Sequence, residues 1–73
     1  MQQTSLVYTY TIEGNITVEF ELYSSAVRGR YCLFGSINGI DVPEEIFRTN
    51  SDEQAIEIAD ASICERLRAK GVN

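Results

Sequence analysis

The sequence predicts an α+β fold, in which a three-stranded antiparallel meander is covered on one face by one C-terminal helix. Two observations predict it. Residues 5–37 are rich in alternating apolar and polar side chains, whereas residues 52–70 repeat their apolar side chains every three or four positions. With 73 residues the chain makes one small domain, 1–73. A domain of this size buries only about 60% of its unfolded surface, so we expect a marginal core.

The first predicted element is a β-hairpin over residues 5–23, because both arms alternate with period two. Directly opposed residues of an antiparallel pair share a face. A three-residue loop at 13–15 sets Ile12 against Ile16, whereas a two-residue loop would set Ile12 against polar Thr17 and mix the faces. We therefore predict the three-residue loop, with one of its last two residues in the left-handed conformation.

A third strand is predicted over residues 31–37, after a loop that Gly29 interrupts. Asn38-Gly39 then indicates a tight turn. Two interpretations of the next segment remain open. Residues 40–42 would form a short fourth strand of the meander, or residues 41–47 would begin a helical turn, since an aspartate is followed by a proline and a glutamate within three positions.

The C-terminal segment predicts an amphipathic helix. Ser51 is a good N-cap, Gln54 lies where it would complete a capping box, and Gly71 is a natural stop. Acids in the first turn and bases in the last turn suit the helix dipole. The stripe expected to pack on the sheet comprises Ile56, Ala59, Ile63 and Leu67.

The negative charge of the chain is concentrated in residues 41–60, which hold seven of the eleven acids and one base, Arg48. Such asymmetry informs about partners and not about the fold. We therefore predict a partner-binding acidic face; the alternative is that these acids only solvate the surface. The acidic face comprises Asp41, Glu44, Glu45, Glu53, Glu57 and Asp60.

Our first hypothesis for the function is a non-enzymatic protein-binding module, an inhibitor or adaptor that engages a basic surface of a larger protein. Small acidic proteins of phages and mobile elements offer an analogy by size and charge alone. A second hypothesis is a nucleic-acid-binding regulator that uses Arg28, Arg30 and Tyr31, although the overall charge of −5 disfavours it. A third is a structural homodimer, formed through an edge strand or through the helix face around Ile58.

The sequence offers little to catalysis, because it has no histidine and none of the glycine-rich phosphate-binding motifs. We predict no enzyme, no cofactor and no metal site. Cys32 and Cys64 are expected to be reduced thiols, with a disulfide between strand and helix as the less favoured alternative. The absence of an N-terminal signal pattern and of a long apolar run predicts a cytoplasmic protein without membrane association.

Overall fold

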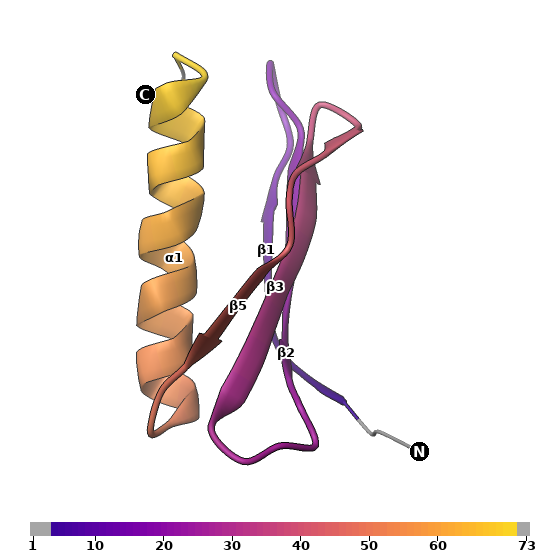
Figure 1. The fold of residues 1–73 in the computed structure, drawn as a ribbon. Coiled ribbons are helices and arrows are strands. Elements are labelled where there is room, and N and C mark those ends of the chain that lie inside the picture. The colour runs from indigo at the N-terminus through magenta and orange to yellow at the C-terminus, as the bar shows by residue number, and fades with distance from the viewer. Residues whose placement is uncertain (1–3, 72–73) are drawn as a thin grey trace.

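In the computed structural model, which describes residues 4–71, a five-stranded antiparallel sheet is followed by one helix (Figure 1). The elements are β1 (Ser5–Ile12), β2 (Val18–Ser24), β3 (Arg30–Ile37), β4 (Ile40–Asp41), β5 (Glu45–Arg48) and α1 (Asp52–Ala69). The strand order is β1-β2-β3-β4, and β5 also pairs with β3. The predicted α+β fold class is therefore confirmed. The segment from which we argued the absence of a secretory signal lies partly outside the described residues.

The hairpin has the predicted faces, except at Leu6, but not the predicted register. Ile12 lies opposite Val18, so the loop comprises residues 13–17 and the three-residue loop is wrong. The backbone of Thr17 bonds elsewhere: its N–H donates to Asn38 Oδ1 at 2.9 Å, and its carbonyl accepts from the Asn38 N–H at 2.7 Å. Thr17 is thus held by the turn after β3 and does not extend the hairpin. From Tyr8 to Ile12 the register differs by two residues, so each of these side chains keeps its face. A β-bulge between Leu6 and Tyr8 sets Leu6 opposite Tyr23 instead, so Leu6 moves to the face turned away from the core.

Strands β4 and β5 form an interrupted edge beside β3. Asp41 lies opposite Ser36, whereas Glu45 lies opposite Leu33, so the edge contains one residue more than β3 between these pairs. This is a β-bulge, and it contains Pro43, which has no N–H to donate to a ladder. The fourth strand is confirmed as Ile40–Asp41, and the alternative of a helical turn over residues 41–47 is wrong.

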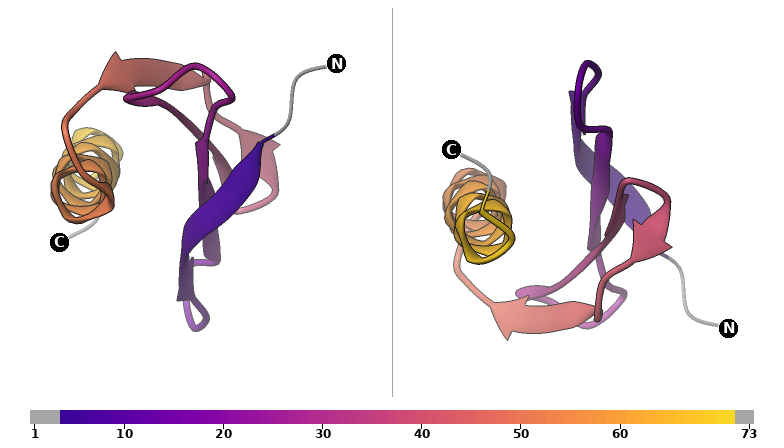
Figure 2. Two further views of the ribbon diagram at one scale, coloured as in Figure 1. Left: turned by 90° about the horizontal axis from the view of Figure 1, so that it is seen from below. Right: turned by 90° about the horizontal axis from the view of Figure 1, so that it is seen from above.

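The hydrophobic core lies between α1 and the inner face of the sheet, which bends around the helix (Figure 2). The stripe that we predicted is largely confirmed, since three of its four residues are buried. Ala55 is fully buried, however, while Ile56 is only half-buried, so the helix is rotated slightly from the predicted phase. The buried core residues are Val18, Phe20, Leu22, Tyr31, Leu33, Ile37, Ala55, Ala59, Ile63 and Leu67.

Both ends of α1 are capped. The Ser51 side chain accepts from the Gln54 N–H at 3.2 Å, as predicted. The second half of the capping box is wrong, because the Gln54 side chain accepts from the N–H of Asn50 and from the hydroxyl of Thr49, not from Ser51. At the other end Gly71 has φ of 80° and follows the last helical turn, as expected of a stop.

Candidate functional site

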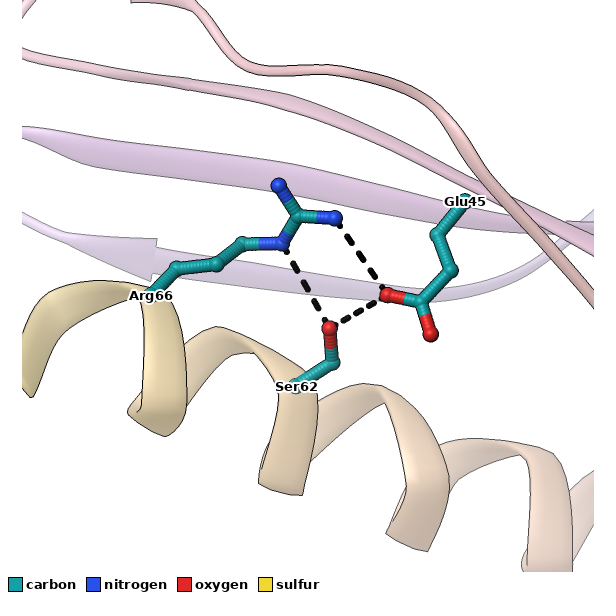
Figure 3. Close-up of polar contacts among 3 residues, drawn as sticks. All are labelled: Glu45, Ser62 and Arg66. Carbon is teal, nitrogen blue, oxygen red and sulfur yellow. Dashed lines mark hydrogen bonds and ion pairs between the residues drawn. The ribbon is translucent and has the colours of Figure 1, made fainter. Parts of the chain in front are cut away.

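The predicted acidic residues lie on different sides of the molecule, and only Glu45, on β5, contacts the flank of α1 that faces this strand. Glu45 Oε1 accepts from Ser62 Oγ at 2.5 Å and from Arg66 Nη2 at 3.3 Å, and Arg66 Nε donates to Ser62 Oγ at 3.4 Å (Figure 3). Glu45–Arg66 is the one ion pair found within residues 4–71. Glu45 therefore joins β5 to the helix, and its charge is compensated inside the domain.

The flank of α1 that faces β1 holds three of the predicted acids, and we call it the acidic flank: Glu53, Glu57 and Asp60. At 100° per residue these three lie on one side of the helix. Asp60 is half-buried and accepts from the Tyr8 hydroxyl at 3.0 Å. Burial first, and then this hydrogen bond, raise the pKa of Tyr8. Glu53 and Glu57 are exposed, so the acidic flank presents their two carboxylates to the solvent.

Asp41 and Glu44 lie on the edge formed by β4 and the bulge, and both are exposed. Asp41 lines a groove on the outer face of the sheet, which is the face turned away from α1. Asp41 therefore lies apart from the acidic flank, and the six predicted acids do not form a single face. The physical reason is the layering, because sheet residues of one face are separated from the helix by the sheet itself.

The groove on the outer face contains two acids that the sequence analysis missed. Glu19 and Glu21, from β2, lie with Asp41 and the half-exposed ring of Phe34 around a volume of about 570 Å³. Period two already indicates that Glu19 and Glu21 share a face. Their approach to Asp41 follows from the strand order β2-β3-β4, in which Ser36 lies between Glu19 and Asp41.

The residues of the alternative nucleic-acid contact are only partly available. Arg28 is exposed in the loop before β3, and Arg30 is half-buried at the first position of β3. Tyr31 is 6% exposed, its ring stacks on Phe47 at 5.9 Å between centroids, and its hydroxyl donates to Asp52. The expectation that Tyr31 stacks on a base is therefore wrong, because alternation along β3 turns its ring into the core.

The helix face around Ile58 forms a shallow hollow of about 560 Å³, lined also by Ala61, Ser62 and Ala69. Ile58 is 37% exposed. Ala55, three positions before Ile58, does not line this hollow and belongs to the core. The hollow is small and its apolar lining consists mainly of alanine side chains beside one isoleucine.

The two cysteines are free thiols on opposite sides of the sheet. Cys32 is half-buried on the outer face, between Tyr23 and Ile46, and Cys64 is exposed on the helix. This separation excludes the strand-to-helix disulfide within one chain. Within the described part of the chain, no group of three acidic, cysteine or histidine side chains could hold a metal ion. No helix among the same residues is long and apolar enough to cross a membrane.

Comparison of the chain with protein families, curated proteins and solved structures gives no match to any of the three.

Proposed function

We propose that the chain is a non-enzymatic protein-binding module, an inhibitor or adaptor, whose acidic flank binds a basic surface of a larger protein. The observation that carries the proposal is the contrast between the two flanks of α1. Glu45 is neutralised by Arg66, whereas no cation lies within ion-pair distance of Glu53, Glu57 or Asp60 in the described structure. The flank thus keeps its charge for a partner.

The energetic cost of the acidic flank supports a role in binding. Glu53 and Glu57 are like charges four residues apart, and Glu57 and Asp60 are like charges three residues apart. Each such pair destabilises a helix by a few tenths of a kcal/mol, where an opposite charge would stabilise it. Folding gives a reason for Asp60, which accepts from Tyr8, but beyond the preference for acids near the helix N-terminus it gives none for Glu53 and Glu57.

The proposal is tested by neutralising the two exposed acids of the flank, Glu53→Gln with Glu57→Gln. Asp60 is left unchanged because its carboxylate also accepts from Tyr8. The matched control is Glu13→Gln with Glu65→Gln, which removes the same charge from exposed sites outside the flank. Each variant and the wild type are immobilised, and proteins retained from a lysate of the native host are compared by mass spectrometry.

We expect at least one basic protein that the wild type and the control retain and that the flank variant loses. Its affinity for the purified chain should weaken as salt rises, since exposed charges are screened beyond about 10 Å at 0.1 M. Equal retention by the flank variant and the control would contradict the proposal. Retardation of generic DNA or RNA by the wild type, abolished by Arg28→Ala with Arg30→Ala, would favour the nucleic-acid hypothesis instead.

A further inference from the structure

The outer face of the sheet, which α1 does not cover, is organised in rows of side chains that run across the strands. The register gives one row with an apolar side chain on each of four strands. We call it the apolar row: Leu6, Tyr23, Cys32 and Ile46. Leu6 is 53% exposed and Ile46 is 49% exposed. The half-exposed ring of Phe34, in the next row, meets Tyr23 edge to face at 5.9 Å.

The charges on this face are sorted by sign along the strands. On one side of the apolar row lies the acidic end: Glu19, Glu21 and Asp41. On the other side lies the basic end, Arg30 and Arg48, which are directly opposed on β3 and β5. Strand alternation places both arginines on the outer face, since their neighbours Tyr31 and Phe47 pack against each other on the inner face.

Neither end is compensated within the domain. Arg30 and Arg48 are like charges directly opposed across two strands, an arrangement that destabilises an isolated sheet. No carboxylate lies within ion-pair distance of either arginine in residues 4–71, and no cation lies within that distance of the acidic end. The face therefore carries an apolar centre between two uncompensated charges of opposite sign.

We propose that this outer face is the interface of a homodimer, in which two copies pack face to face about a two-fold axis along the apolar row. Such an axis superimposes the apolar rows and brings the acidic end of each copy over the basic end of the other. The row of Glu21 and the row of Arg30 are each two residues from the apolar row along their strands, so they meet at the same height across the axis.

A second copy of the chain on the outer face would explain three features of the domain. The dimer covers Leu6, Phe34 and Ile46, it brings carboxylates of the other copy over the end that holds the opposed arginines, and it enlarges the small core of a 73-residue domain. A second copy fits this face better than a basic or acidic partner would, because either of those would match one end and oppose the other. The proposal does not depend on the proposed function, since the acidic flank lies on the helix and not on this face.

The first test is sedimentation equilibrium of the wild type, Ile46→Lys and Ile58→Lys. Both variants place a lysine at an exposed isoleucine, and only Ile46 lies on the outer face. We expect the wild type and Ile58→Lys to dimerise, and Ile46→Lys to raise the dissociation constant at least about tenfold. A wild type that stays monomeric up to about 1 mM would overturn the proposal, as would loss of the dimer in Ile58→Lys alone.

Charge reversal gives a second test that does not depend on one substitution. Variant A carries Arg30→Glu with Arg48→Glu, and variant B carries Glu19→Arg with Glu21→Arg. Each should be monomeric alone, because like charges then face each other across the axis. An equimolar mixture of A and B should restore the dimer, since the substituted ends then face charges of opposite sign and only Asp41 of variant B is left unmatched. If both variants retain the wild-type circular dichroism spectrum and their mixture stays monomeric, the charge pairing that we propose is wrong.

The native cysteines give a third test. The axis places Cys32 of one copy opposite Cys32 of the other, and facing sheets pack about 10 Å apart. That spacing is too long for a disulfide but is bridged by a short bis-maleimide. Cys64→Ser, which keeps only Cys32, should cross-link to a covalent dimer, whereas Cys32→Ser should not. Cross-linking through Cys64 alone would place the interface elsewhere.

Discussion

The two faces of the sheet are built from the same strands, yet one is buried and the other is exposed. On the inner face, Phe20, Leu22 and Leu33 are at most 2% exposed beneath α1. On the outer face, Phe34 and Ile46 are 41% and 49% exposed, and nothing in the described chain covers them. Alternation along a strand decides which residues share a face. It does not decide which face the rest of the chain will cover, and that depends on where the single helix packs.

The polar groups follow the same division. Toward the helix, the hydroxyls of Tyr8 and Tyr31 and the carboxylate of Glu45 all have partners, and no buried side-chain oxygen or nitrogen within residues 4–71 lacks one. On the outer face the acids and arginines stand apart, sorted by sign. The inner face therefore holds the buried contacts of the domain, and the outer face and the acidic flank are the surfaces that we propose for association. The following substitutions test that division.

The largest effect is expected from Ile63→Ala, which removes a fully buried side chain from the inner layer. We expect a loss of about 2 to 4 kcal/mol in the free energy of unfolding, from lost burial and from the cavity left behind. The control is Ile58→Ala, the same chemical change at a partly exposed site of the same helix, for which we expect less than about 1 kcal/mol. Urea denaturation of both measures the difference, and equal midpoints would show that the helix packs in another phase.

Gly35→Ala should destabilise the domain by disrupting the contact between β3 and β2 on the inner face of the sheet. A Cβ at Gly35 would collide with the backbone carbonyl oxygen of Glu19 and would lie 2.5 Å from the Phe20 ring. Since backbone atoms cannot move aside cheaply, we expect a loss of about 1 to 3 kcal/mol or more. Gly14→Ala is the control, because a Cβ there meets nothing within 4 Å. Thermal melts that fall equally for both variants would contradict the close packing of β2 on β3.

Much of this inner layer could be predicted from the sequence, since burial imposes a period. The strand alternation, the Asn38-Gly39 turn and the positions Ala59, Ile63 and Leu67 all follow from local patterns. The hairpin register could not, because the backbone of Thr17 bonds to Asn38, a contact between distant parts of the chain. A register error of two residues leaves the faces of Tyr8 to Ile12 unchanged, so the pattern gives no warning of it. The alternation also does not reveal the β-bulge that turns Leu6 to the outer face.

The site was harder to predict than the fold. Charge counting identified the acids of residues 41–60, but it combined six residues from the edge of the sheet and the helix into one face. It could not show that Glu45 reaches Arg66, since that contact requires β5 to be a strand beside the helix. The outer face was also missed, because its rows combine residues from four strands whose order and register only the tertiary structure provides.

The two tyrosine–carboxylate contacts make the inner layer sensitive to alkaline pH. The hydrogen bond to Asp52, and then burial, raise the pKa of Tyr31; burial, and then Asp60, raise that of Tyr8. A pKa raised above the unfolded value of 10.0 means that the folded state holds the proton more tightly. This contribution to stability is therefore complete below about pH 10 and is lost as pH rises through the folded values.

We accordingly expect the urea midpoint of the wild type to fall between about pH 10 and about pH 11.5, above the ordinary tyrosine pKa. The double variant Tyr8→Phe with Tyr31→Phe cannot release these protons, so its midpoint should start lower and fall less over the same interval. Parallel midpoint curves for the two proteins would mean that neither hydroxyl is linked to folding.

The smallest effect is expected where the division between stability and association is sharpest, at the acidic flank. Glu53→Gln with Glu57→Gln removes a like-charge pair four residues apart and touches no hydrogen bond found in the structure, since neither side chain bonds to another in residues 4–71. Relief of the repulsion should raise the free energy of unfolding by a few tenths of a kcal/mol. The loss of the favourable interaction between Glu53 and the helix N-terminus offsets part of this gain. The same substitutions should weaken partner binding. If stability rises while binding falls, the acids form a charge cluster that is retained for association. A clear loss of stability on neutralisation would show instead that these acids stabilise α1, and the proposed role of the flank in binding would lose its support.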